Sequence, residues 1–215
     1  QPDLKLVYNS GHRDINDVFG SSWSINIPYI QRVNKKGYEN LYGSESDSYF
    51  YSVLDGELVL IIGSSYRAKT ENGDFNTYNF SSNSWLVTAK DGTTYKFGYQ
   101  AATHQNNPNA TSDVYKWMLE EVRDTNNNYI KYTYYKDAGQ IYPSSIVYTG
   151  HNTTDGIFQI DFTRTVSTYT TPSYDAGFSV TSNYYVSEIQ AKVNGTWVNK
   201  YALSYTASPN SGKLF

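Results

Sequence analysis

One group of side chains in this sequence has the spacing of a metal site. Asp124, Asn126 and Asn128 match the first three positions of the calcium-loop pattern D-x-[DN]-x-[DN]-G, whose oxygens hold the ion. Tyr129 stands where that loop needs glycine, and Tyr135 stands where it needs a bidentate glutamate. The sequence therefore favours a hairpin tip whose Asp and Asn side chains cap their own backbone. We expect no metal and no cofactor.

Carboxylate pairs are the second possible source of chemistry. Glu120 and Glu121 are adjacent, so on a strand they point to opposite faces and cannot flank one bond. A glycosidase needs two carboxyl groups roughly 5 to 9 Å apart in a cleft, and sequence spacing alone does not give that separation. Two other pairs can share a strand face, Asp113 with Glu121 and Asp55 with Glu57. We interpret all of them as solvated strand carboxylates.

The histidines and small nucleophiles form no catalytic pattern. His12, His104 and His151 lack the H-x-x-x-H spacing of metal ligands, and we expect them at the surface. The sequence contains no G-x-S-x-G turn and no glycine-rich phosphate-binding motif. We therefore predict no catalytic residues and no enzyme activity.

Short segments between frequent turn signals make up most of the chain. Asp-Gly and Asn-Gly pairs tolerate the positive φ of tight hairpin turns, and the segments that flank them alternate between apolar and polar residues. Amphipathic helical segments of about ten residues do not alternate with these strands, which argues against an α/β fold. We expect hairpin turns at Asp55 and Gly56, at Asp91 and Gly92, and at Asn194 and Gly195.

Residues 117–135 decide between a helix and a hairpin. As a helix, the first part has about seven residues and no clear cap, which is short for a stable helix. From Tyr129 to Tyr135 the residues alternate with a period of two, which indicates a strand. We predict two strands joined by a tip at residues 124–128. Residues 100–113 are a long polar stretch that we interpret as a mobile or functional loop.

Tyrosine is the unusual component of this 215-residue chain, which has 23 tyrosines. Aromatic residues suit half-buried sheets, and the length suits a single β-rich domain spanning residues 1–215. The tyrosines either stack on sugars or form cross-strand ladders. We expect Trp23, Trp85, Trp117 and Trp197 to be buried anchors. The predicted aromatic faces are Tyr129 with Tyr135, Tyr132 with Tyr134, and Trp197 with Tyr201 and Tyr205.

Charge and composition exclude several classes of protein. The formal net charge is −3 and only 17% of residues are charged, so there is no basic surface for nucleic acid. The chain has no cysteine, which excludes disulfides and thiolate metal sites. Its longest apolar run, Leu58 to Ile62, is far shorter than the roughly 20 residues of a membrane span.

Five stretches, in order, resemble the N-terminal domain of the virulence-plasmid B protein family, the SpvB-type domain. The same domain opens the B component of Tc toxin complexes, which are relatives of Rhs and YD-repeat shell proteins. Ser22 and Asn127 replace glycines of the family pattern, and both positions need a residue that tolerates an unusual backbone conformation. The similar stretches are VFGSSWSINIPYIQR (18–32), DSYFYSVLDGELV (47–59), WLVTAKDGTTYKFG (85–98), WMLEEVRDTNNNYIKYTY (117–134) and IYPSSIVYTG (141–150).

This resemblance implies a secreted or extracellular protein of a toxin or virulence system. It implies a non-catalytic structural module, the first part of a β-shell that encloses a C-terminal cargo. We therefore expect an all-β antiparallel hairpin meander that forms a curved sheet or open strip of a larger shell. The ending SPNSGKLF indicates the N-terminal fragment of a longer chain. The expected partner is the rest of that chain or a shell-forming subunit; the alternative function is a secreted carbohydrate-binding or adhesion domain, with a glycan as partner.

Overall fold

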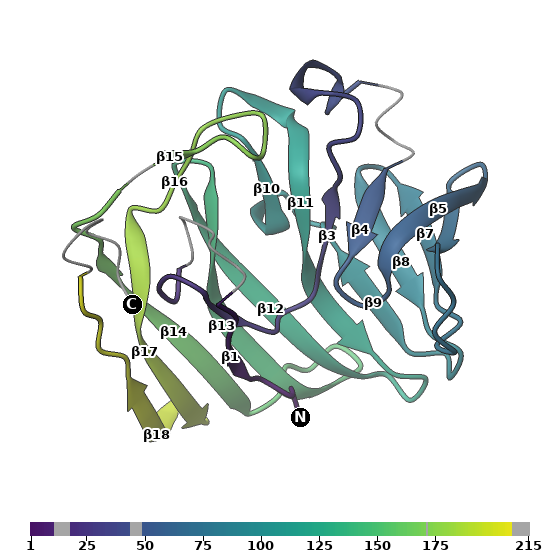
Figure 1. The fold of residues 1–215 in the computed structure, drawn as a ribbon. Helices are drawn as coiled ribbons and strands as arrows, with labels where there is room; N and C mark the ends of the chain where they lie inside the picture. The colour runs from purple at the N-terminus through teal and green to yellow at the C-terminus, as the bar shows by residue number, and fades with distance from the viewer. Residues whose placement is uncertain (11–17, 44–48, 171, 208–215) are drawn as a thin grey trace.

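A single antiparallel sheet dominates the computed structural model, which describes residues 1–10, 18–43, 49–170 and 172–207. Helical structure within these residues is confined to two short 3-10 turns, η1 (Tyr38–Asn40) and η3 (Ala101–Thr103). Figure 1 shows a rounded group of strands on one side and a curved sheet extending away from it on the other. The predicted all-β class with antiparallel hairpins is confirmed.

Eight strands of this sheet close into a barrel. Strand β11 pairs with β3 through Lys116–Met118 and with β9 through Leu119–Arg123. Because the strands from β3 to β9 pair in sequence, these two pairings with β11 close the ring. The open strip predicted from the sequence is wrong here, because the closing β9–β11 pair is not a hairpin and has no local signal. The barrel strands are β3 (Tyr29–Arg32), β4 (Phe50–Ser52), β5 (Gly56–Ile62), β6 (Ser65–Ala68), β7 (Thr77–Ser81), β8 (Ser84–Thr88), β9 (Thr94–Phe97) and β11 (Ala110–Arg123).

Beyond β11 the sheet continues as five more strands that leave the barrel (Figure 1). The predicted hairpin at residues 117–135 is confirmed, since β11 is a strand to its end and pairs with β12 across the 124–128 tip. The sequence of pairings ends at β18, the outermost strand. The extension consists of β12 (Asn128–Asp137), β13 (Gln140–His151), β14 (Phe158–Val166), β17 (Tyr184–Val193) and β18 (Thr196–Ala202).

Most of the polar stretch at 100–113 is ordered structure. It contains η3 and β10 (His104–Asn107), which pairs with β11. Gln105 is buried, and its amide donates to the Gln140 side chain at 3.1 Å and to the Gly139 carbonyl at 3.2 Å. A loop was the wrong prediction because hydrogen bonds from distant strands compensate the burial of these polar side chains. Short pairs outside the main sheet are β1 (Leu6–Tyr8) with β2 (Trp23–Ile25), and β15 (Pro172–Ser173) with β16 (Val180–Thr181).

Aromatic rings fill the barrel. The centroid of the Trp85 ring lies 4.8 Å from that of Phe50 and 4.6 Å from that of Phe80. Trp117 joins them at 6.2 Å from Trp85, and its indole N–H donates to the Asn83 carbonyl at 2.8 Å. Each such ring pair contributes about 0.5–1.5 kcal/mol beyond the burial of its area. The barrel interior is therefore packed with aromatic side chains.

The N-terminal segment packs against the extension. Phe19 is 4% exposed and meets the ring of Phe162 edge-on, with 6.3 Å between the ring centroids. The Val18 carbonyl accepts a hydrogen bond from the Val186 backbone N–H at 2.8 Å. One face of the extension is thus covered by this segment of the same chain, and the barrel and the extension share one hydrophobic core.

Candidate functional site

The Asp124 carboxylate holds the hairpin tip together. One oxygen accepts hydrogen bonds from the backbone N–H groups of Asn126 and Asn128, both at 2.8 Å, and the other accepts from the Asn128 amide at 2.8 Å. These bonds, first the one from the Asn128 side chain, lower the pKa of Asp124. The described residues contain no group of three or more His, Asp or Glu placed to hold a metal ion. Both carboxylate oxygens of Asp124, the candidate metal ligand, therefore accept hydrogen bonds that stabilise the turn.

The neighbouring carboxylates also have structural partners. Glu121 forms ion pairs with Lys96 and Arg123, each at 2.9 Å, and hydrogen bonds from Arg123 first and Lys96 second lower its pKa. Glu120, the preceding residue of β11, accepts a hydrogen bond from the Gln100 backbone N–H at 2.9 Å. The register between β9 and β11 shifts between Leu119 and Glu121, so the regular alternation on which the prediction of opposite faces depends is interrupted at Glu120.

Asp55 and Glu57 flank the start of β5 and are occupied as well. Asp55 accepts hydrogen bonds from the buried Tyr78 hydroxyl and from the Asn76 amide, the latter at 2.9 Å. Burial, followed by the bond to Asp55, raises the pKa of Tyr78. Glu57 binds Lys69 at 3.1 Å. These contacts join the β4–β5 turn to neighbouring strands.

The two histidines within the described residues have structural hydrogen-bond partners. His104 is half-buried, and its Nε2 donates to the Gly98 carbonyl at 2.7 Å; burial lowers its pKa. The prediction of a surface histidine is wrong at this position, because β10 packs the ring against Gly98 and Trp117. His151 is exposed at the end of β13, as predicted, and His12 lies outside the described residues.

The four tryptophans divide by position in the fold. Trp85 and Trp117 are fully buried in the barrel, as expected, and Trp23 is half-buried beside Tyr8. Trp197 is 62% exposed, so its prediction as a buried anchor is wrong. The reason is its place on β18, which has a neighbouring strand on one side only within the described residues.

Tight turns occupy the predicted positions. Gly56, Gly92 and Gly195 have φ angles of 81°, 85° and 77° at hairpin tips. Ser22 and Asn127, which replace glycine in the family pattern, have φ angles of 68° and 63°. Both non-glycine residues therefore adopt the left-handed backbone conformation that the resemblance required.

Most of the predicted aromatic faces are internal. Tyr129 and Tyr132 are buried, and burial raises the pKa of Tyr132 to about 12. The Tyr134 hydroxyl donates to the Leu119 carbonyl at 2.6 Å, and burial raises its pKa. These side chains support the sheet and cannot stack on a sugar. Of the tyrosines at 129, 132, 134 and 135, Tyr135 alone is exposed, by 37%.

Tyr135 lies at an opening in the extension. Strands β13 and β14 pair from Tyr148 opposite Phe158 as far as Ser145 opposite Asp161, and their pairing stops there. β14 continues alongside β17, while β13 continues alongside β12, so the two strands separate. Pro143, which has no N–H, lies just beyond this point.

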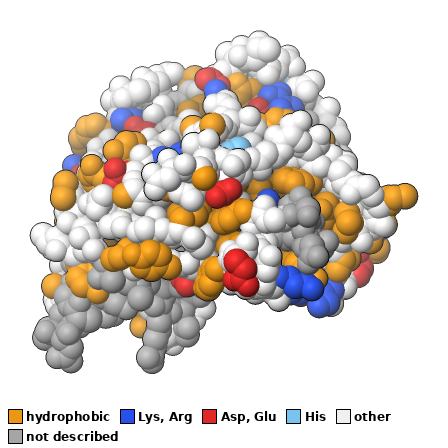
Figure 2. All heavy atoms as spheres, turned by 90° about the horizontal axis from the view of Figure 1, so that it is seen from above, with side chains coloured by type: hydrophobic (Ala, Val, Ile, Leu, Met, Phe, Trp, Pro, Cys, Tyr) orange, Lys and Arg blue, Asp and Glu red, His pale blue; other side chains and the backbone are white. Residues whose placement is uncertain are grey.

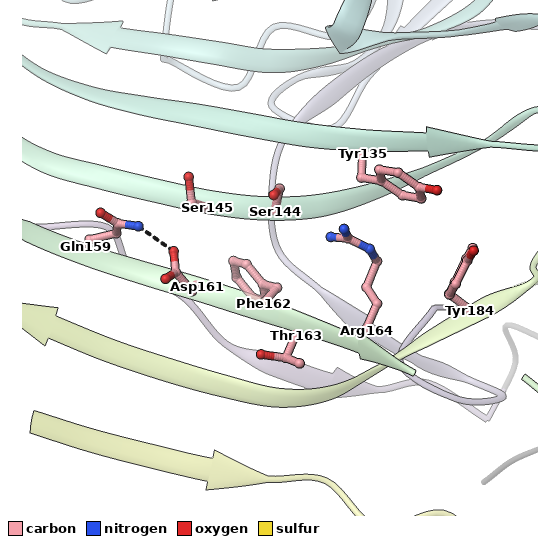
Figure 3. A pocket seen from close by; sticks show the side chains of 9 residues that line it. All are labelled: Tyr135, Ser144, Ser145, Gln159, Asp161, Phe162, Thr163, Arg164 and Tyr184. Atoms are coloured by element: carbon pink, nitrogen blue, oxygen red, sulfur yellow. Dashed lines mark hydrogen bonds between the residues drawn. The ribbon is translucent and has the colours of Figure 1, made fainter. Parts of the chain in front are cut away.

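The opening is a hollow of about 650 Å³ that we call the β13–β14 window (Figure 3). At its far end the Gln140 amide donates to the Ser182 hydroxyl at 2.9 Å, and the Asn183 amide donates to Asp137 at 2.7 Å. These bonds join the start of β13 and the end of β12 to the residues that precede β17. The window is lined by Tyr135, Ser144, Ser145, Gln159, Asp161, Phe162, Thr163, Arg164 and Tyr184.

Arg164 is the central charge of the window. Its guanidinium carbon lies 4.3 Å from the centroid of the Tyr135 ring, and Figure 3 shows the side chain in the space between the two strands. Asp161 is the acid of the window, but it is paired with Lys192 at 2.6 Å on the neighbouring strand. Its backbone belongs to the β14–β17 ladder, but its guanidinium forms no ion pair or hydrogen bond with a residue that the structure describes.

Sequence reasoning missed this window. The separation depends on partners that are distant in sequence, so Arg164 and Tyr184 carry no local signal. Pro143 was the available clue, because proline inside a strand indicates an edge or a bulge.

The outer strand β18 is the second exposed feature. All seven of its residues are exposed, including Val198 at 61% and Tyr201 at 57%. Ala191 lies opposite Asn199 and Lys192 lies opposite Trp197, so Val198 is an extra residue that forms a bulge. The predicted shared face of Trp197 and Tyr201 is therefore wrong, since directly opposed residues share a face and the bulge reverses the alternation.

The molecular surface has few charges. On the face shown in Figure 2, Lys and Arg side chains are scattered in small groups among polar and hydrophobic ones. Within the described residues, no helix has both the length and the apolar character needed to cross a bilayer.

A comparison with protein families gives one match. The sequence profile described as Salmonella virulence plasmid 65kDa B protein (SpvB) matches residues 1–81 and 64–174. These ranges together cover more than half of the 215 residues, and the chain belongs to the SpvB family. A search of curated proteins returned no match.

Three solved structures are similar in fold to this chain. The N-terminal domain of effector protein SpvB from Salmonella typhimurium strain LT2 matches with a TM-score of 0.82 and 18% identity, over 100% of this chain and 92% of that one. A Photorhabdus luminescens Tc holotoxin pore with a mutated TccC3 matches at 0.79 and 19%, over 99% of this chain. A TcdB2-TccC3 structure matches at 0.77 and 18%, over 99%. The chain spans 14% of the length of each of these two Tc chains.

Proposed function

We propose that this domain is a non-catalytic structural module of a secreted toxin-type protein, in which it forms part of the wall of a β-shell around a cargo. Membership of the SpvB family supports this role, as does the similarity in fold to a segment of much longer Tc toxin chains. The carboxylates of Asp124 and Glu121 also fit it, because their hydrogen bonds and ion pairs hold a hairpin tip and neighbouring strands together.

The observation that carries the proposal is the outer strand β18. A strand with one free edge presents a row of backbone N–H and C=O groups that pair readily with another strand. Trp197 and Val198, 62% and 61% exposed, add apolar area beside that edge. Such an edge suits a sheet that is continued by further strands, which come from the remainder of its own chain or from a shell-forming partner.

Cysteine labelling tests this role, because the native chain has no cysteine. Val198→Cys places a single thiol on β18, and Ile62→Cys places one on β5, where the native side chain is 76% exposed. In the chain 1–215 both thiols should react readily with a maleimide. In the complete gene product we expect slow labelling at 198 and unchanged labelling at 62.

Two results would contradict the proposal. If the thiol at 198 reacts at the same rate in both proteins, no strand covers the edge. A complete gene product that consists of this domain alone also contradicts a shell role.

A further inference from the structure

We propose that the β13–β14 window binds an acidic sugar, a pyranose that carries a carboxylate. The proposal is independent of the structural role of β18, because the window lies between other strands and does not involve the sheet edge. It begins from Arg164, a cation in a hollow of about 650 Å³. Small-ligand sites have volumes of roughly 300–1,000 Å³, so the hollow has the size for one or two sugar units.

The guanidinium of Arg164 is available for an anion. It stacks at 4.3 Å from the Tyr135 ring centroid, which fixes its position without using its N–H donors. Five donors in a planar fork match the two oxygens of a carboxylate. Asp161 does not compete, because Lys192 pairs with it at 2.6 Å. A ligand carboxylate would therefore complement the charge of the Arg164 guanidinium.

The rest of the lining suits a polyhydroxylated ligand. Ser144, Ser145 and Tyr184 supply hydroxyl groups, and Gln159 supplies an amide. Figure 3 shows these side chains around the same opening as Arg164. Ser145 already hydrogen-bonds the Thr133 hydroxyl at 2.8 Å, and the Gln159 amide donates to Asp161 at 2.5 Å, so each group offers a ligand its remaining donor or acceptor. Neutral groups that both donate and accept are the usual partners of sugar hydroxyls.

An added peptide strand fits the window less well than a sugar. A strand needs a regular series of backbone donors and acceptors along the edge that receives it. On the β13 side, Pro143 provides no N–H, and Ser144 has no opposed residue in β12, where Tyr134 lies opposite Pro143 and Thr133 opposite Ser145. The window is therefore better suited to binding a small ligand through its side chains.

Calorimetric titration of the chain 1–215 with glucuronic acid tests the proposal. Glucose is the matched uncharged sugar, and inorganic phosphate is the anion without a ring. Because bonds to a charged group carry the recognition, we expect glucose to bind about tenfold or more weakly than glucuronate. Phosphate should also bind more weakly. Equal binding of glucose, binding of phosphate as tight as glucuronate, or no binding of glucuronate would overturn the inference.

Variants locate the site. Arg164→Gln should weaken glucuronate binding about ten- to a hundredfold, and Arg164→Lys should weaken it less, because lysine keeps the charge without the fork. Arg67→Gln removes the same charge from an exposed position on β6 and should leave binding unchanged. If Arg164→Gln unfolds, Gln159→Glu serves instead, since the added charge repels the ligand. Unchanged binding in the folded variant would refute the assignment.

Discussion

At the scale of single residues, position in the sheet decides what a tryptophan contributes. Trp117 is 0% exposed, and its indole N–H donates to a backbone carbonyl in the β7–β8 turn. Trp197 belongs to the same residue type and also sits on a strand, yet its side chain is 62% exposed. The two residues make a matched pair for measuring how much of the stability depends on the barrel.

Trp117→Ala should lower the free energy of unfolding by about 3–5 kcal/mol, because it leaves a large cavity in the aromatic core. Trp197→Ala should change it by no more than about 0.5 kcal/mol, the usual range for an exposed substitution. Urea denaturation followed by circular dichroism measures both values. Similar losses for the two variants would contradict the burial described here.

Glu121 should make stability depend on pH. Its pKa is lowered in the folded state, so its contribution is present above the unfolded pKa of about 4.3 and is lost as pH falls through the folded value. The difference in unfolding free energy between the native chain and Glu121→Gln should therefore be largest near pH 7 and shrink below about pH 4. Urea denaturation across this range measures it.

Glu39→Gln is the control for net charge in that experiment. Glu39 is exposed and has no ion pair with a described residue. A difference between native chain and Glu121→Gln that stays constant with pH would show that the ion pairs with Lys96 and Arg123 do not stabilise the fold.

At the scale of elements, one glycine lies where β9 meets β11, the pair that closes the barrel. Gly98 follows β9 with a φ of 70°, and a Cβ atom there would lie 2.2 Å from Cδ1 of the buried Trp117 ring. Gly195, at the β17–β18 turn, has a similar φ of 77° but open space around it. Both positions need a residue that can adopt a positive φ, but of the two only Gly98 also lacks space for a side chain.

Gly98→Ala should therefore destabilise the fold more than Gly195→Ala. The left-handed conformation costs an alanine about 1–2 kcal/mol at either position. Overpacking against Trp117 should add about 1–3 kcal/mol at Gly98. Thermal unfolding of the two variants gives the comparison, and equal melting temperatures would mean that the ring can move aside.

The hairpins could be predicted because their signals are local. Gly56, Gly92 and Gly195 mark turns between adjacent strands, and the alternation beyond Tyr129 indicated the second arm of the central hairpin. The wrong predictions depend on contacts between distant residues. Barrel closure needs β9 beside β11, and the polar residues near Gln105 are buried because Gly139 and Gln140 bond to them.

The candidate site was less predictable than the fold. Asp124 and its neighbours carried a motif, and the structure uses them in a turn. The β13–β14 window carried none, because it results from a place where two strands stop pairing. Arg164 looks like any solvated strand arginine until Tyr135 and Tyr184 are placed beside it.

At the scale of the whole molecule, a closed barrel and an open extension are joined through β11. Among the strands that the structure describes, each barrel strand has a neighbour on both sides, whereas the extension ends at β18, whose residues are all exposed. This asymmetry suits the proposed structural role: the barrel supplies a packed core, and the extension supplies an edge that other strands can continue.

The most direct test of that account is a cryo-electron microscopy structure of the complete gene product. We expect a further strand hydrogen-bonded along the free edge of β18, with Trp197 and Val198 covered by neighbouring sheet. A structure in which the edge of β18 and both of these side chains face solvent would contradict the account.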